Sequence, residues 1–164
     1  TKISYLYTME TACIKTPLGM ATITGNENGI SVIAIADDGV VSEAIPLILQ
    51  EVVTQLNDYF EGKRTEFDVL LNPQGTDFQK KVWNGLLQIP HGKTMSYLEL
   101  SKQLGDVKAI RAVASANGKN PLWIIIPCHR VIGTDGSLTG YAGGLWRKKW
   151  LLELENPSPQ QTLF

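Results

Sequence analysis

Cysteine and histidine are scarce in this sequence of 164 residues, which contains two of each. Cys13 and Cys128 lie far apart and form no cysteine framework, so we expect no stabilising disulfide and a reducing compartment. The cysteines and histidines are too scattered to show the spacing of metal ligands, which argues against a structural zinc site. We therefore expect no metal and no cofactor.

Long hydrophobic runs are also missing. No stretch approaches the roughly 18 to 20 consecutive apolar residues that a membrane span requires. The first residues lack the basic-then-apolar pattern of a signal peptide. With 43% hydrophobic residues, the chain can still bury a core as one domain or two small ones. These features predict a soluble, cytoplasmic protein with no membrane partner.

The net charge of −1 hides an uneven distribution along the chain. Residues 1–75 hold four Lys/Arg against ten Asp/Glu, a balance of −6, whereas residues 76–164 hold eleven against six, a balance of +5. Such asymmetry indicates a polyanionic partner for the second half. The alternative interpretation is chance variation among solvated surface charges.

The pattern of the first half is typical of a small α/β domain. Residues 12–36 read as short strands, with a break at 16–19 and a turn at 26–29 before a β-branched run. After Pro46, a good first-turn residue, apolar positions recur at helical spacing, and Gly62 suits the end of that helix. We expect this helix to cover an antiparallel sheet; its apolar positions are Ile48, Val52, Leu56 and Tyr59.

Turn-forming residues at 72–75 predict a domain boundary after Gly75. Thr76 or Asp77 can cap a new helix that carries Phe78, Val82, Trp83 and Leu86. The predicted fold is therefore an α/β N-terminal domain, a small antiparallel sheet plus helix over residues 1–75. It is joined to a mainly α-helical C-terminal domain over residues 76–164.

A helix-turn-helix is predicted inside the second domain. Ser96 can cap a helix with Glu99 three residues on, a capping-box spacing, and this helix runs to Leu104 before a glycine. A second helix is expected over residues 108–117, and its small side chains would let it approach DNA closely. The alternative is that the two helices are only core scaffolding.

The apolar run 122–126 ends at Pro127 and is followed directly by Cys128, His129 and Arg130. A rigid turn at the end of a buried segment can present a thiol to a cavity. A free thiol has a pKa near 8.5, so reaction near neutral pH needs a base or a positive field, which the next two residues could supply. The alternative is a small buried cysteine beside a structural histidine.

The wider sequence resembles the O6-alkylguanine-DNA alkyltransferase family over nearly the whole chain, and only loosely in the N-terminal domain. The resemblance starts from the stretch 127–133 and from Tyr141-Ala142-Gly143-Gly144, and it extends in chain order on both sides. The other matching positions are 16–19, 72–76, 78–79, 82–83, 96–97, 111–113, 117–118, 120–121, 149–152 and Glu155.

The resemblance implies a reaction and the residues that perform it. Cys128 matches the acceptor that attacks the alkyl carbon and keeps the group as a thioether, so each molecule reacts once. His129 matches the residue that activates the thiol through a water, and Glu155 the carboxylate that orients the histidine. Tyr97 matches the residue that donates to the base and lies against the target phosphate, and Asn120 the one that ties the recognition helix to the active-site segment.

The same resemblance implies that the protein flips the damaged nucleotide out of double-stranded DNA. Arg111 matches the residue that fills the vacated space, and the second helix would enter the minor groove with little sequence preference. The expected substrate is O6-alkylguanine, with O4-alkylthymine as a second one, and the expected state is a monomer. The expected DNA contacts are Arg111, Tyr97, Ala112, Ser115 and Arg130, and the expected pocket residues are Tyr141, Ala142, Gly143 and Gly144.

One departure concerns the pocket, because Ala142 stands where some family members carry a serine that could donate to the alkylated oxygen. A backbone N–H or Tyr97 would have to replace that donor here. Three other functions remain open: a cysteine hydrolase, which would turn over steadily, a DNA-damage binder without chemistry, and a transcription regulator with sequence-specific affinity. The DNA-damage binders without chemistry lack the acceptor cysteine, which this chain retains as Cys128.

Overall fold

The computed structural model describes residues 8–157, which form two compact units. The first unit contains the chain up to Gln74 together with Pro121–Trp123, and the second contains Gly75–Asn120 and the chain from Ile124 onward. Within the described range, the structure has no helix that is both long and apolar enough to cross a membrane.

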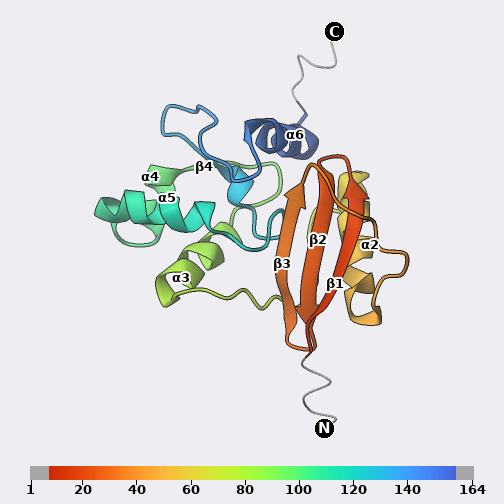
Figure 1. The fold of residues 1–164 in the computed structure, drawn as a ribbon. Coiled ribbons are helices and arrows are strands. Elements are labelled where there is room, and N and C mark those ends of the chain that lie inside the picture. The colour runs from red at the N-terminus through yellow and green to blue at the C-terminus, as the bar shows by residue number, and fades with distance from the viewer. Residues whose placement is uncertain (1–7, 158–164) are drawn as a thin grey trace. The chain divides into compact units, whose positions relative to one another are not determined.

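A three-stranded antiparallel sheet forms the centre of the first unit (Figure 1). Its strands are β1 (Glu10–Thr16), β2 (Gly19–Asn26) and β3 (Gly29–Ala36), in the order β1-β2-β3. Side chains close both hairpins: Thr16 Oγ1 donates to the carbonyl of Gly19 at 2.8 Å, and Asn26 Oδ1 accepts from the N–H of Asn28 at 2.8 Å. The predicted antiparallel sheet is confirmed, and both turns lie where the sequence indicated.

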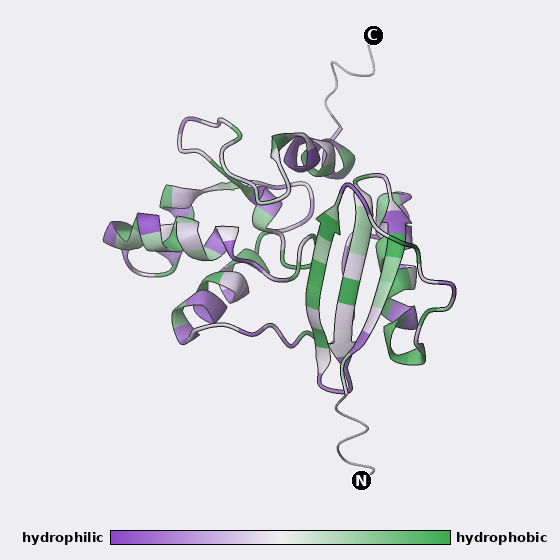
Figure 2. Cartoon of the chain, viewed as in Figure 1, coloured by the Kyte–Doolittle hydropathy of each residue, from purple (hydrophilic) through white to green (hydrophobic). Residues whose placement is uncertain are grey.

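Helix α2 (Gln50–Phe60) covers one face of this sheet, and hydrophobic residues run along the strands (Figures 1 and 2). Its buried apolar residues are Val52, Leu56 and Tyr59, as expected. The helix begins later than its periodicity suggested, because residues 47–49 form a 3-10 turn. A 3-10 turn has three residues per turn, which changes the facing of side chains, so Leu49 is fully buried and Ile48 is only half-buried.

The short segment Pro121–Trp123 adds to the sheet of the first unit. The N–H of Ile33 donates to the carbonyl of Pro121 at 2.9 Å, and the N–H of Trp123 donates back to Ile33 at 3.1 Å. These bonds satisfy backbone groups on the outer edge of β3. The prediction assigned this segment to the second domain, because local sequence pattern carries no signal for such a long-range pairing.

The second unit is mainly helical. Its helices are α3 (Asp77–Leu86), α4 (Tyr97–Gln103), α5 (Ile110–Gly118) and α6 (Leu145–Glu155). A parallel pair of two-residue strands, β4 (Met95–Ser96) and β5 (Val131–Ile132), adds a feature that the sequence did not predict. The predicted fold class, an α/β part with a small sheet followed by a helical part, is confirmed.

Capping boxes start two of these helices. The Thr76 hydroxyl accepts from the N–H of Gln79 and the Gln79 side chain accepts from the N–H of Thr76, which fixes the start of α3. Ser96 and Glu99 make the same reciprocal pair at the start of α4, as the sequence predicted. Local hydrogen bonds thus set where both helices begin.

Trp83 is the largest side chain in the core of the second unit and joins α3 to α5. Its indole N–H donates to the carbonyl of Ala116 at 2.9 Å. A Cβ on Gly75 would lie 2.5 Å from the Trp83 ring, so the chain can pass this ring only with a glycine there. Phe78 lies on this helix, as expected, and is 39% exposed.

Helices α4 and α5 form the predicted pair, with a short turn between them (Figure 1). Helix α5 starts at Ile110 and not at 108, because residues 107–109 form a 3-10 turn capped by the Asp106 side chain. Val113, Ala116 and Asn117 are the buried residues of α5. The opposite face exposes Arg111, Ala112 and Ser115.

Candidate active site

Cys128 opens a 3-10 turn, η3 (Cys128–Arg130), that follows the buried run Ile124–Ile126. Pro127 precedes the turn, and the N–H of Cys128 donates to the carbonyl of Ile126 at 2.8 Å. The thiol residue is 5% exposed. The apolar run anchors the turn, so the backbone holds the sulfur in a fixed, nearly dry place.

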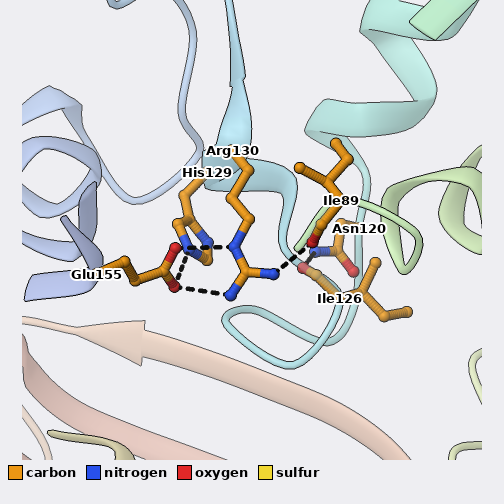
Figure 3. Close-up of polar contacts among 6 residues, drawn as sticks. All are labelled: Ile89, Asn120, Ile126, His129, Arg130 and Glu155. Atoms are coloured by element: carbon orange, nitrogen blue, oxygen red, sulfur yellow. Dashed lines mark hydrogen bonds and ion pairs between the residues drawn. The ribbon is translucent and has the colours of Figure 1, made fainter. Parts of the chain in front are cut away.

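The next residue, His129, is fully buried and bonded to the end of α6 (Figure 3). Its Nε2 lies 2.8 Å from Oε2 of Glu155. Arg130 holds the same carboxylate with two bonds, Nε to Oε1 at 2.8 Å and a terminal nitrogen to Oε2 at 2.9 Å. The other terminal nitrogen of Arg130 donates to the carbonyl of Ile89 at 2.7 Å. Two consecutive residues of η3, His129 and Arg130, therefore fix the carboxylate of Glu155.

The charges of this cluster follow from its burial and its bonds. Burial acts to raise the pKa of Glu155, but the hydrogen bonds and charges of His129 and Arg130 outweigh it and hold that pKa below its ordinary value. Burial lowers the pKa of His129, although Glu155 opposes it. Near neutral pH the carboxylate is therefore charged and the imidazole neutral, and Nε2 carries the hydrogen that Glu155 accepts.

This tautomer leaves Nδ1 of His129 as an acceptor. Nδ1 is buried and has no hydrogen-bond partner among residues 8–157. A neutral imidazole with its Nε2–H held by a carboxylate is the arrangement in which the other nitrogen can take a proton. The cluster can therefore act as a general base for a neighbouring thiol.

Cys128 itself needs such a base. Burial raises the pKa of its thiol to about 11, although a hydrogen bond from Asn120 and the charge of Lys148 act to lower it. At neutral pH the resting group is thus a thiol. Its reactivity depends on neighbours that take the proton and stabilise the thiolate.

Asn120 connects the end of α5 to the nucleophile turn. Its side-chain amide donates to the carbonyl of Ile126 at 2.7 Å, and its backbone N–H donates to the carbonyl of Asn117 at 3.3 Å (Figure 3 shows the first bond). Asn120 also hydrogen-bonds the sulfur of Cys128. One side chain thus links α5, the turn and the thiol.

Tyr97, the first residue of α4, directs its hydroxyl to the segment before Tyr141. The hydroxyl donates to the carbonyl of Thr139 at 3.5 Å and accepts from the Asn117 side chain at 3.4 Å. Burial and the nearby Cys128 raise the pKa of Tyr97, which keeps the hydroxyl protonated. The protonated hydroxyl therefore connects the start of α4 to Asn117 of α5 and to the carbonyl of Thr139.

The predicted pocket residues 141–144 form the loop that leads into α6. Gly144 adopts φ +90°, a conformation that favours glycine, and it precedes the first residue of the helix. Its N–H donates to the carbonyl of Tyr141 at 2.9 Å, and Arg147 donates to the carbonyl of Gly143 at 2.9 Å. The loop is therefore held from its own backbone and from the helix that follows, while Ala142 is exposed.

Arg130, an expected DNA contact, is largely buried. It is 7% exposed, and its guanidinium is occupied by Glu155 and Ile89. This geometry does not support a DNA contact. If the guanidinium turned outward to DNA, the buried carboxylate of Glu155 would lose its charged partner, which is energetically costly. By contrast, Arg111, Ala112 and Ser115 are exposed together on α5.

Sequence reasoning missed two basic residues, Arg147 and Lys148 of α6, which are both buried. Exposed lysines and arginines are the rule on helices, so their residue type gave no signal. Spacing could have identified Arg147. Residues 147, 151 and 155 are four positions apart on a helix, so Arg147 shares a face with Leu151 and Glu155. In the described part of the chain, no cluster of His, Cys, Asp or Glu is placed to hold a metal ion.

Comparisons with known families match both units. Residues 77–157 match the family described as "6-O-methylguanine DNA methyltransferase, DNA binding domain". Residues 9–73 match "6-O-methylguanine DNA methyltransferase, ribonuclease-like domain". The two matches lie in chain order and together span most of the sequence.

Individual relatives agree with these matches. A methylated-DNA–protein-cysteine methyltransferase of Methanosarcina acetivorans is 45% identical over 153 residues, which are 88% of this chain and 96% of that protein. The crystal structure of Mycobacterium tuberculosis O6-methylguanine methyltransferase has a TM-score of 0.81 at 42% identity, covering 96% of this chain and all of the other. A structure of Mycobacterium tuberculosis OGT in complex with DNA has a TM-score of 0.81 at 47% identity, covering 88% and 92%.

Proposed function

Because this chain belongs to the 6-O-methylguanine DNA methyltransferase family, we propose that it repairs DNA by direct reversal, moving an alkyl group from O6 of guanine to its own Cys128. One observation carries the proposal: a buried thiol precedes a buried neutral histidine whose Nε2 is bonded to a carboxylate. Relatives that are named methylated-DNA–protein-cysteine methyltransferase support the same chemistry.

The transfer begins with a proton. His129 accepts the thiol proton at Nδ1 through a water molecule, and the charge of Glu155 stabilises the imidazolium that forms. The thiolate of Cys128 then attacks the alkyl carbon in line with the bond to O6. A carbon–sulfur bond forms as the carbon–oxygen bond breaks, and the electron pair of the broken bond stays on guanine.

The leaving guanine is the second half of the reaction. A hydrogen bond from the Tyr97 hydroxyl, and backbone N–H groups of the loop 141–144, stabilise the charge that develops on the base. The proton that left the thiol restores neutral guanine. The thioether on Cys128 resists hydrolysis, so the protein is a transferase that reacts once per molecule and needs no cofactor.

Double-stranded DNA that contains the damaged base is the partner. We place the exposed face of α5, with Ala112 and Ser115, in the minor groove, where contacts to phosphates and sugars give little sequence preference. Arg111 fills the space left by the flipped nucleotide. Residues 76–164 would supply both the DNA-binding surface and the alkyl acceptor, and residues 1–75 a separate N-terminal domain.

The proposed substrate range includes small alkyl groups on O6 of guanine and on O4 of thymine. Both atoms lie next to a ring nitrogen on the Watson–Crick edge, so one pocket can present either to Cys128. Ala142 offers no side-chain donor, which leaves Tyr97 and backbone groups to bind the oxygen. We further propose that the protein works as a monomer in the cytoplasm, where its cysteines stay reduced.

The test is a single-turnover assay with a duplex that carries one O6-methylguanine labelled with tritium in the methyl group. We expect the label to move from DNA to protein, guanine to be restored, and transfer to stop at one methyl per molecule. Cys128→Ser should still bind duplex DNA with a salt-dependent affinity but transfer nothing. Steady release of labelled product would instead indicate a hydrolase, and label that stays on DNA would overturn the proposal.

A further inference from the structure

Asn117 lies near the end of α5 and is buried, with 3% of its surface exposed. An N–H of its side-chain amide donates to the hydroxyl oxygen of Tyr97 at 3.4 Å. Two bonds hold the backbone at this point of the helix. The carbonyl of Ala116 accepts from the indole of Trp83 at 2.9 Å. The carbonyl of Asn117 accepts from the N–H of Asn120 at 3.3 Å, so a fixed part of the chain carries the amide.

The other polar atom of this amide makes asparagine a costly choice here. Oδ1 of Asn117 is buried and has no hydrogen-bond partner among residues 8–157. A buried acceptor without a partner destabilises the folded state, and an apolar side chain of similar shape avoids that loss. Packing alone therefore does not explain the asparagine, whereas its bond to Tyr97 does.

The Tyr97 hydroxyl lies between a donor and an acceptor. It accepts from Asn117 at 3.4 Å and donates to the carbonyl of Thr139 at 3.5 Å. A phenolic hydroxyl has one hydrogen, and its oxygen can accept while it donates. Because Asn117 donates to the oxygen, the hydrogen points away from that N–H. The bond to Thr139 is long and therefore weak, so a better acceptor on a bound base can take its place.

We propose that Asn117 is a positioning residue for alkyl transfer: its amide donates to the oxygen of Tyr97 and so presents the hydroxyl hydrogen to the guanine that loses the alkyl group. The proposal rests on the proposed function, in which Tyr97 stabilises the leaving base. Asn117 does not contact the base and acts through Tyr97 alone. A buried amide that is unfavourable for the fold is thus retained for the direction of one hydrogen.

The first test needs no DNA. Burial and the nearby Cys128 raise the pKa of Tyr97, and the hydrogen bond from Asn117 opposes that rise. Asn117→Leu keeps a similar shape but removes the amide, so the pKa of Tyr97 should rise further, by about half a unit. NMR of ring-labelled tyrosine measures this pKa, and the Tyr97 signal is identified by its loss in Tyr97→Phe. Asn84→Leu, an exposed position on α3, is the matched control and should not change it.

The second test measures the coupling of the two side chains during transfer. Asn117→Leu should slow methyl transfer from an O6-methylguanine duplex by about three- to tenfold, which corresponds to one hydrogen bond. In a Tyr97→Phe background the same change should slow transfer no further, because there is no hydroxyl to orient. Asn84→Leu should leave the rate unchanged in both backgrounds.

Thermal unfolding separates orientation of the hydroxyl from support of the fold. Because Oδ1 is buried without a partner, Asn117→Leu should unfold at the wild-type temperature or above it. Asn117→Ala removes the same donor and serves where Asn117→Leu folds poorly. An unshifted Tyr97 pKa in a folded variant, or an equal slowing with and without the Tyr97 hydroxyl, overturns the proposal. If the pKa shifts but the wild-type protein moves no methyl from DNA, the proposed function fails and the control of the hydroxyl by Asn117 stands.

Discussion

Nε2 of His129 lies 2.8 Å from Oε2 of Glu155, and both side chains are buried. The contact joins the residue after the nucleophile to the last residue of α6, across a sequence separation of 26 residues. It fixes the imidazole as the tautomer whose free nitrogen can accept a proton.

Replacing Glu155 with glutamine should weaken this base. Glu155→Gln keeps the size but removes the charge that favours imidazolium, so the apparent pKa of the Cys128 thiol should rise. Alkyl transfer near neutral pH should slow by about 10- to 100-fold, with partial recovery at higher pH. A pH series of single-turnover rates measures both effects. The matched control is Glu153→Gln, two residues earlier on α6 and 40% exposed in its side chain, which should react like the wild type.

A double mutant shows whether the histidine and the carboxylate act as one unit. His129→Ala should slow transfer as Glu155→Gln does, and the double mutant should be little slower than the slower single mutant. Losses that multiply, together with an unaltered thiol titration and a lower thermal midpoint, would indicate that Glu155 only supports the fold.

Stability should fall as the solution becomes acidic. The pKa of His129 lies below its ordinary value of 6.5, so below that pH the unfolded chain takes up a proton that the folded chain does not. The pKa of Glu155 lies below its ordinary value of 4.5, so the same holds again below that pH. Each group thus contributes stability that is present at higher pH and lost as the pH drops, at up to roughly 1.4 kcal/mol per pH unit.

Denaturant unfolding of variants at several pH values checks this dependence. His129→Gln should flatten the curve between pH 6.5 and 4.5, whatever its absolute stability. The other histidine provides the control, since His91→Gln should retain the wild-type slope. Equal slopes in the two variants would contradict a buried, neutral His129.

Arg111 should matter for duplex DNA and not for the chemistry. Arg111→Ala removes an exposed side chain of α5, so repair of a methylated duplex should fall strongly, by about tenfold or more, because extrusion of the base costs a few kcal/mol. Reaction with free O6-alkylguanine should be unchanged. Lys80→Ala, an exposed cation on α3, controls for lost charge. Equal losses on both substrates would show that Arg111 acts on the fold or on the thiol.

The Thr76 capping box should contribute measurably to stability. Thr76→Ala removes the acceptor for the N–H of Gln79 at the start of α3, the helix that carries Trp83. We expect a loss of about 1 kcal/mol in the free energy of unfolding, and Thr76→Ser should restore most of it. Alkyl transfer by the folded protein should not change. Urea titrations of the three proteins decide this point.

Local features of the fold were predictable because their causes are local. Ser96 and Glu99 form the capping box that their spacing indicated, and the turns around residues 16–19 and 26–29 follow from residues that bond their own backbone. Periodicity identified α2, but it placed the start too early because a 3-10 turn precedes it. Such a turn leaves no separate signal in the sequence.

Features that depend on distant partners could not be predicted. Arg130 follows the nucleophile and suggested a DNA contact, yet Glu155, 25 residues later, draws its guanidinium into the interior. Lys148 gave no signal in the sequence, because its three carbonyl partners, in β5 and at residues 139 and 140, lie 8 to 17 residues earlier. Ile124 adopts φ +75° close to the nucleophile, which a β-branched residue rarely does, and tertiary packing must impose this conformation.

The most direct measurement is the location of the methyl group after reaction with a duplex that contains O6-methylguanine. Peptides of the reacted protein are mapped by mass, with Cys13 as an internal comparison because it is the second free cysteine. We predict the mass increase of one methyl in place of hydrogen on the Cys128 peptide, at one per molecule, and an unmodified Cys13 peptide. A methyl group on Cys13, with Cys128 unmodified, would contradict the account.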